Sequence, residues 1–124
     1  MPIDLKYDRA VKILHATIRE HISPDEFSDA TKEMISSDEY PPDVKVLWDA
    51  RSIKKLPFDM NVMMEFIEIR KKYPERGKAR LAIIVSGDFA FGISRMYEML
   101  SSHLPQNIMI FKDYDQGKQW LQSD

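Results

Sequence analysis

The sequence predicts one α/β domain over residues 1–124, with a mostly parallel sheet and an antiparallel strand at its amino-terminal edge. Two observations lead to this fold class. Two strand patterns follow each other closely in residues 1–20, which is typical of a hairpin. From residue 23 onward, strand-like runs alternate with helical segments of about ten residues or more, and such long spacers connect parallel neighbours. The expected element order is ββαβαβαβα, with the helices packed on the sheet.

The amino-terminal hairpin is predicted from the spacing of its apolar residues. Ile3, Leu5 and Tyr7 alternate with charged residues, the period-two pattern of a strand with one buried face. Residues 11–18 (VKILHATI) are rich in β-branched side chains, which favour strands. We therefore expect two antiparallel strands that turn near Asp8.

The first helix has the clearest local signal in the chain. In residues 23–26 (SPDE), Ser23 and Glu26 have the spacing of a capping box, and Pro24 suits the first helical position. The prolines at positions 41 and 42 cannot continue a helix. We expect this helix to end before Tyr40.

The remaining elements follow the same rules. Residues 44–50 (VKVLWDA) predict a strand, residues 81–85 (LAIIV) a central strand and residues 108–111 a last strand. One helix is expected from Asp59, its cap, to about Tyr73, and a short final helix after the cap Asp113. The helix after residues 86–88, capped by Ser86 or Asp88, is expected to turn one side to the core, with Phe89, Ile93, Met96, Tyr97, Leu100 and Leu104.

The composition excludes several classes of protein. With 44% hydrophobic residues the chain can form one core, and its net charge of -2 lacks the positive excess of most nucleic-acid binders. Cysteine is absent, which excludes thiol chemistry and disulfides and fits a reducing cytoplasm. No apolar run approaches the roughly 20 residues of a membrane span, and residues 1–4 lack a signal-peptide pattern. We expect a cytoplasmic protein without a transmembrane segment or nucleic-acid partner.

Several segments together resemble the SpoIIAA-like, or STAS, family of anti-sigma-factor-antagonist-type domains. They are the hairpin strand KILHATI, the strand VLWDA that ends in Asp49, the strand LAIIV, and the segments FGISRMYEML and IMIFKDYDQGKQWL. The last two are more similar to an uncharacterised bacterial SpoIIAA-like branch than to the signalling members. The resemblance implies a SpoIIAA-like fold and a bacterial protein-interaction or small-ligand-binding module that is not an enzyme and needs no cofactor.

The chain departs from the signalling members at their phosphorylation site. In those members a kinase phosphorylates a serine in an Asp-Ser-Ser-Gly-like turn at the start of the helix after the third strand. The matching residues 59–62 (DMNV) contain no serine, threonine or glycine. Ser52 lies three residues after Asp49 and does not occupy the family's position. We therefore expect a module that lacks the usual phosphorylatable serine.

Two loops at the carboxyl ends of predicted parallel strands are candidate binding sites, because ligands of such sheets bind there. The first follows the third strand and offers carboxylate, guanidinium, hydroxyl and ammonium groups. Such a set can hold an anion or an acidic patch of a partner, whereas in the alternative Asp49 caps the loop and the lysines are merely solvated. The candidate residues of this loop are Asp49, Arg51, Ser52, Lys54, Lys55 and Asp59.

The second loop follows the fourth strand. Gly87 and Gly92 have the spacing of a phosphate-binding P-loop, but Ile93 replaces the lysine that this motif requires, so we do not expect a nucleoside triphosphatase. The loop either binds one anion through backbone amides or is a plain strand-to-helix turn. An exposed Phe91 would mark an interaction surface, and the alternative is burial under the neighbouring loop. The candidate residues are Ser86, Gly87, Asp88, Phe91 and Arg95.

The helix of residues 59–73 carries more apolar side chains than contact with one sheet face needs, at about 100° per residue. The surplus indicates a homodimer, a partner protein or a slot for a lipid or small apolar ligand, and methionine suits the last two. In the alternative the helix is wedged between two neighbours within one chain. We predict self-association through Met60, Met63, Met64, Phe66 and Ile67.

Other polar groups give weaker signals. A basic cluster follows this helix, and it is either solvated or attracts anionic head groups or an acidic partner; it contains Arg70, Lys71, Lys72, Arg76, Lys78 and Arg80. The three histidines lack ligand spacing, so no metal site is expected. No serine stands in a nucleophile pattern.

These observations predict a non-catalytic STAS-like interaction or regulatory module, dimeric, whose partner the sequence does not identify. The alternative is a small-ligand or lipid-binding protein with an apolar slot beside helix 59–73. A third possibility is an enzyme that uses Asp49, Arg51 and Asp88. A ligand-binding protein is distinguished by an internal apolar cavity, and an enzyme by a carboxylate with a perturbed pKa in a cleft.

Overall fold

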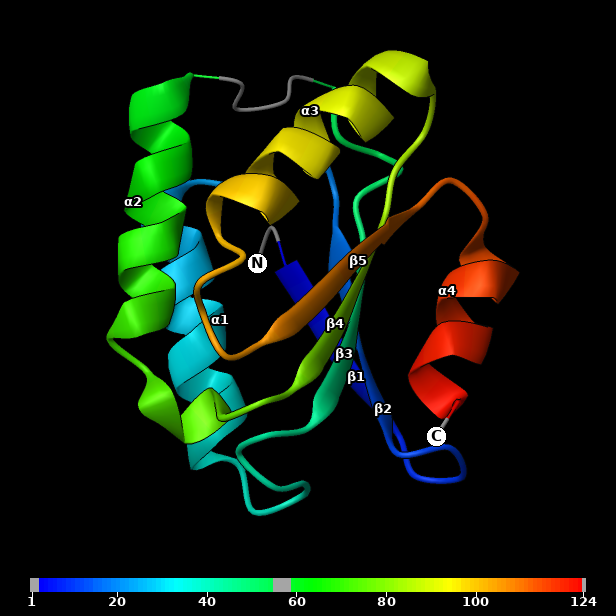
Figure 1. Cartoon of the computed structure of the whole chain (residues 1–124). Helices are drawn as coiled ribbons and strands as arrows, with labels where there is room; N and C mark the ends of the chain where they lie inside the picture. Colours follow the sequence, from blue (N-terminus) through cyan, green and yellow to red (C-terminus); the bar gives the residue numbers. More distant parts are fainter. Residues whose placement is uncertain (1–2, 55–58, 124) are drawn as a thin grey trace.

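The computed structural model describes residues 3–54 and 59–123 and has the predicted order of elements (Figure 1). The strands are β1 (Ile3–Asp8), β2 (Ile13–Ile18), β3 (Lys45–Asp49), β4 (Arg80–Ile84) and β5 (Asn107–Phe111). The α-helices are α1 (Pro24–Ser36), α2 (Met60–Lys71), α3 (Asp88–Leu100) and α4 (Tyr114–Gln122), and a short 3-10 helix covers Pro74–Arg76.

The sheet has the strand order β1-β2-β3-β4-β5, which follows the sequence. β1 pairs with β2 in antiparallel orientation, with Ile3 opposite Ile18, and the other three pairs are parallel. The hairpin turn includes Lys12 with φ of 59°. The predicted α/β class, with a mostly parallel sheet and an antiparallel edge strand at the amino terminus, is confirmed.

The helices form two layers on opposite faces of the sheet. Helices α1, α2 and α3 cover one face, and α4 covers the other (Figure 1). Each of the first three connects a strand to its next parallel neighbour in the same direction across the sheet. Because such crossovers are right-handed, they place their helices on the same face. The helix α4 follows the last strand and is free to pack on the opposite face.

Each face of the sheet has its own apolar cluster. The larger one fills the space under α1, α2 and α3 and includes Leu14, Val46 and Trp48. The smaller one lies under α4, and its buried members are Ile13, Leu47, Ala82, Ile84 and Leu121. Alternate residues of β3 therefore enter different clusters, as the period of a strand requires.

Three of the predicted helix caps are confirmed. In α1, Glu26 N donates to Ser23 Oγ at 3.2 Å and Ser23 N donates to Glu26 Oε1 at 2.9 Å, which completes the capping box. Asp59 accepts from Asn61 N in α2 at 2.8 Å, and Asp113 accepts from Gln116 N in α4 at 3.1 Å. These bonds satisfy amide groups that have no partner within the helix.

The predicted start and core side of α3 are partly wrong. Gly87 with φ of 87° is the cap residue. No side chain in the described part of the chain caps this helix, because Asp88 is already its first residue and binds Lys112. Phe89 is 69% exposed and Met96 43% exposed, against the prediction. The helix packs over β5, the edge strand, so only a narrow stripe of it is covered.

Candidate ligand-binding site

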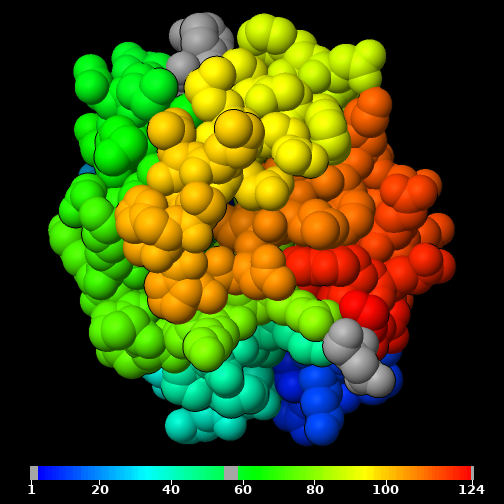
Figure 2. Space-filling view, in the orientation of Figure 1, coloured from blue at the N-terminus to red at the C-terminus, as the bar shows by residue number. Residues whose placement is uncertain are grey.

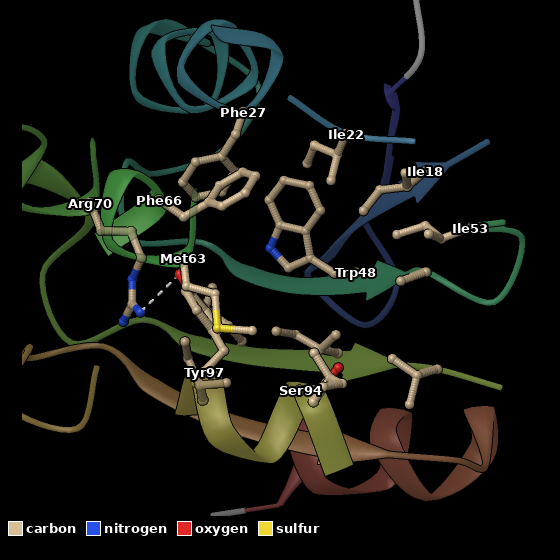
Figure 3. A pocket seen from close by; sticks show the side chains of 16 residues that line it. Ile18, Ile22, Phe27, Trp48, Ile53, Met63, Phe66, Arg70, Ser94 and Tyr97 are labelled. Atoms are coloured by element: carbon tan, nitrogen blue, oxygen red, sulfur yellow. Dashed lines mark hydrogen bonds between the residues drawn. The ribbon is translucent and has the colours of Figure 1, made fainter. Parts of the chain in front are cut away.

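An apolar cavity of about 130 Å³ lies between the sheet and the layer of α1, α2 and α3 (Figure 3). Its walls come from the inner face of the strands, from the loops that follow them and from all three helices. The lining residues are Ile18, Ile22, Phe27, Trp48, Ala50, Ile53, Met63, Phe66, Arg70, Leu81, Ile83, Val85, Ile93, Ser94, Tyr97 and Ile108.

Aromatic rings form one wall of the cavity. The Trp48 ring centroid lies 5.6 Å from that of Phe27, and the Phe27 centroid lies 5.4 Å from that of Phe66 in an edge-to-face arrangement. These rings come from α1, β3 and α2, three consecutive elements of the chain. Ala50 follows Trp48 on the same side of the chain, and its small side chain leaves space beside the indole. The end of β3 and the residue after it thus bring a large and a small side chain to the cavity.

Arg70 brings the cavity its only charged group among the lining residues. Its side chain comes from α2, and the residue is 6% exposed. Arg70 Nη1 donates to Tyr97 Oη at 3.2 Å, the bond drawn in Figure 3, and Nη2 donates to Gln106 Oε1 at 3.1 Å. Burial raises the pKa of the Tyr97 hydroxyl above its ordinary value, although Arg70 opposes this effect. Tyr97 therefore stays a neutral hydroxyl at physiological pH.

The prediction of a solvated basic cluster is wrong for Arg70 and Arg76. Arg76 is 5% exposed and its Nη1 donates to the Pro42 carbonyl at 2.8 Å. Burial lowers the pKa of Arg76 to about 10. Both arginines line a second, smaller cavity of about 20 Å³ next to Phe27 and Gln106.

The loop after β3 pairs its charges with one another. Arg51 donates to Asp49 through Nε at 2.9 Å and Nη2 at 2.8 Å, and the hydrogen bond from Arg51 lowers the pKa of the Asp49 carboxyl despite its partial burial. Lys54 Nζ lies 3.6 Å from Glu20 Oε1, and Ser52 is exposed. Asp59 caps α2, and Lys55 lies outside the described residues. The described members of this candidate site therefore do not converge on one place.

Charged residues of the loop after β4 and of the start of α3 also form ion pairs with nearby side chains. Asp88 binds Lys112 Nζ at 2.8 Å, which lowers the pKa of its carboxyl, and Arg95 Nε lies 3.5 Å from Glu98 Oε1. Phe91 is half-buried and packs on the larger core, so it is not an exposed marker of an interface. Ser86 and Gly87 remain exposed, and their use as an anion site stays a prediction.

The five candidate interface residues of α2 divide into two groups. Met63, Phe66 and Ile67 are buried by the chain itself, with exposed fractions of 3%, 7% and 0%, so the prediction that they face another molecule is wrong. Met63 and Phe66 line the apolar cavity instead. Met60 and Met64 remain exposed, at 50% and 40%. The apolar surplus of this helix is explained in part by a cavity wall.

The described part of the chain shows neither a metal-binding cluster nor a membrane-spanning helix. Over residues 3–54 and 59–123, no group of three or more His, Asp or Glu side chains lies close enough to hold a metal ion. Within the same ranges, no helix is both long and apolar enough to cross a membrane. His15 contacts Tyr114, whose Oη lies 3.0 Å from Nδ1 of the imidazole.

Sequence reasoning missed the polar end of the cavity. Arg70 lies seven residues after Met63 and four after Phe66, so it continues the buried stripe of α2. A cation at a position where the helical period requires an apolar side chain is the signal that could have found it. Tyr97 and Gln106 carry no such signal, because their distance from Arg70 is set by how α3 packs over the sheet.

No family model and no curated protein matches this sequence. One solved structure is similar, described as an uncharacterised protein from the DUF3478 family with a SpoIIAA-like fold, from Shewanella loihica PV-4. The likeness has a TM-score of 0.64 at 17% sequence identity and covers 96% of this chain and 91% of that one. Together with the sheet order and the placement of the helices, this likeness shows that the chain has the SpoIIAA-like fold that its sequence predicts.

Proposed function

We propose that this protein is a non-catalytic binding module that holds a small molecule, largely apolar, in the cavity between the sheet and α2 and α3. The single observation that carries the proposal is the cavity itself, with its volume of about 130 Å³ and its lining of aromatic and aliphatic side chains. The SpoIIAA-like fold suggests a STAS-type module, and such folds are generally non-enzymatic.

The size of the cavity fits a small ligand. An engineered protein cavity of about 150 Å³ lined by apolar side chains stays dry and binds benzene. A cavity of about 130 Å³ therefore suits an apolar group of about six carbon atoms. Met63 at the wall adds adaptability, because its thioether side chain adjusts to ligands of different shapes. This favours the ligand-binding alternative over a module that acts only through its outer surface.

The polar groups of the site support binding better than catalysis. Among the lining residues the functional groups are the Arg70 guanidinium, the Ser94 and Tyr97 hydroxyls and the Trp48 indole. No carboxylate or imidazole from the lining set is available as a general base. The perturbed carboxylates Asp49 and Asp88 are not among the lining residues, and each is bound by a neighbouring cation.

Tryptophan fluorescence tests the proposal directly. The chain has two tryptophans, and only Trp48 lines the cavity, whereas Trp120 packs against Phe111 on the other face. In a Trp120→Phe background, we expect titration with 1-heptanol or heptanoate to change the Trp48 emission in a saturable manner. The Ser94→Phe variant fills the cavity with a ring and is expected to abolish the response. Ser102→Phe, at an exposed position outside the cavity, is the matched control.

The fluorescence titration distinguishes a cavity that binds such ligands from one that does not. A saturable change with either probe that Ser94→Phe removes and Ser102→Phe retains supports the proposal. If neither seven-carbon probe changes Trp48 emission in the parent, the cavity does not bind such ligands and the proposal is wrong.

Self-association is a second candidate function, favoured by exposed methionines on α2 and α3. Met60, Met64, Met96 and Met99 are 50%, 40%, 43% and 68% exposed. Both helices that carry them are visible on the face of the molecule shown in Figure 2, α2 in green and α3 in yellow. Large exposed apolar side chains of this kind suit a contact with another protein chain.

Sedimentation velocity tests this second candidate. We expect the parent chain to sediment as a dimer and a Met60→Lys, Met64→Lys double variant as a monomer. Met109→Lys, at a 40% exposed position on β5, is the control and should remain dimeric. A parent that sediments as a monomer across the concentration range would show that homodimer formation is wrong, without bearing on ligand binding.

A further inference from the structure

Arg70 occupies an unusual position for a cation. It lies on the buried side of α2, is 6% exposed, and borders both the apolar cavity and the smaller cavity beyond it. In Figure 3 its side chain lies at one end of the cavity, with Ile18 and Ile53 at the other end and Trp48 between them. The cavity thus has one charged end and one aliphatic end.

The charge of Arg70 is not neutralised by the protein. A guanidinium has five N–H donors. Its hydrogen-bond partners among the described residues are the neutral Tyr97 hydroxyl and the neutral Gln106 amide, and the Tyr97 ring centroid lies 5.7 Å from the guanidinium carbon. The Nε atom is buried and has no hydrogen-bond partner within residues 3–54 and 59–123. Across the described residues, no carboxylate oxygen lies within 4 Å of the Arg70 nitrogens.

Two other arginines, in contrast, have a carboxylate or several carbonyl groups as partners. Arg51 donates two hydrogen bonds to the Asp49 carboxylate, and Arg80 donates to the carbonyl groups of Trp120 and Ser123. The buried Oε1 of Glu98 lies 3.5 Å from Arg95 Nε and does not pair with Arg70. An unpaired buried ion costs several kcal/mol of desolvation in proteins. Arg76 is equally buried, and its Nη2 also lacks a hydrogen-bond partner among the described residues, but it does not line the larger cavity. Arg70 is therefore the buried cation that an anion entering the larger cavity would meet.

We infer that the cavity binds a small monocarboxylate, with the carboxylate on the Arg70 guanidinium and an apolar body extending past Trp48 toward Ile18 and Ile53. This inference rests on the proposed function and specifies its ligand class. The planar fork of arginine matches a carboxylate with two parallel hydrogen bonds. A monoanion fits better than a phosphate monoester, because Arg70 is the single charged residue in the lining set and a second negative charge would stay unpaired.

The cavity volume limits the size of the apolar part of the ligand. A cavity of about 130 Å³ accommodates about six carbon atoms. Heptanoate supplies six carbons beyond its carboxylate, and 1-heptanol and heptylamine have chains of the same length with a neutral or a positive head. These three probes differ only in the group that would meet Arg70.

Isothermal titration calorimetry of the whole chain tests the inference. We expect heptanoate to bind at least about tenfold more tightly than 1-heptanol, since hydrogen bonds to a charged group are worth more than neutral ones, and heptylamine not to bind measurably. In Arg70→Met we expect heptanoate affinity to fall about tenfold or more while 1-heptanol affinity stays within about twofold. Lys72→Met removes one positive charge from the exposed end of the same helix and should leave all affinities unchanged.

These measurements distinguish a failure of the Arg70 inference from a failure of the proposed function. If 1-heptanol binds as tightly as heptanoate, or Lys72→Met lowers heptanoate affinity as much as Arg70→Met does, the Arg70 site is wrong and the apolar cavity stands. If neither heptanoate nor 1-heptanol binds, the proposed function itself is wrong. Should Arg70→Met fail to fold by circular dichroism, Arg70→Gln and the comparison of the three probes on the parent chain still give these outcomes.

Discussion

Gly117 allows α4 to approach the sheet more closely than a side chain would permit. A Cβ atom at this position would lie 2.5 Å from Ile84 Cδ1 and 3.2 Å from Phe111 Cδ2. Ile84 is fully buried, so its methyl group cannot move without disturbing the small cluster under α4. Gly92 in α3 offers the contrast, because no atom of the described residues lies within 4 Å of a Cβ added there.

Alanine substitutions at the two glycines are expected to change the free energy of unfolding in opposite directions. Gly117→Ala is expected to lower the free energy of unfolding by about 1 kcal/mol net, because overpacking costs about 1–3 kcal/mol and alanine regains up to about 1 kcal/mol in a helix. Gly92→Ala is expected to raise it by up to about 1 kcal/mol. Urea denaturation measures both. Equal effects of the two substitutions would contradict the close approach of α4.

His15 gives the protein a pH dependence of known sign. Burial is the main cause that lowers the pKa of this imidazole below 6.5, with the carboxylates of Asp8 and Asp49 acting in the opposite direction. The unfolded chain therefore takes up a proton at a higher pH than the folded chain does. Stability that depends on neutral His15 is present above about pH 6.5 and is lost as the pH falls below it.

The corresponding experiment compares two chains over a range of pH. We expect the free energy of unfolding of the parent to decline between about pH 7.5 and pH 5.5, and that of His15→Gln to decline less, because glutamine does not titrate. Glutamine also keeps an amide that can bond to the Tyr114 hydroxyl, the present partner of His15. Parallel curves for the two proteins would mean that His15 does not cause the pH dependence.

At the scale of elements, local sequence signals determine most helix starts. Ser23, Asp59 and Asp113 were each predicted as caps from their side chains and spacing, and each accepts the expected backbone hydrogen bond. The start of α3 could not be predicted in the same way. There the carboxylate of Asp88 binds Lys112, a residue 24 positions away, and only tertiary structure decides between the two uses of that carboxylate.

The capping box of α1 predicts a measurable contribution to stability. Ser23→Ala removes the acceptor for Glu26 N, and loss of such a cap costs about 1 kcal/mol. Thermal unfolding followed by circular dichroism checks the value. Ser102→Ala, at an exposed position with no side-chain hydrogen bond in the described structure, is the control. A Ser23→Ala protein as stable as this control would show that the box adds nothing.

At the scale of the whole molecule, the topology followed from connection rules, whereas the cavity did not follow from any of them. Helical spacers and the amino-terminal hairpin define the strand order, since each parallel crossover leads to a neighbouring strand. The cavity exists where Phe27, Trp48, Phe66 and Tyr97 meet from four elements. Its volume depends on how these side chains pack, and single-sequence periodicity gives only the side of each element that is buried.

The central claim is that this cavity takes up a small ligand, and methyl NMR of isoleucine δ1 groups tests it most directly. Ile18, Ile22, Ile53, Ile83, Ile93 and Ile108 line the cavity, whereas Ile13 and Ile84 lie under α4 on the opposite face. On titration with heptanoate, saturable shift changes are expected in the first group, with the second group unchanged. Shifts that do not saturate, or that are equally large for Ile13 and Ile84, would contradict a ligand site between α2, α3 and the sheet.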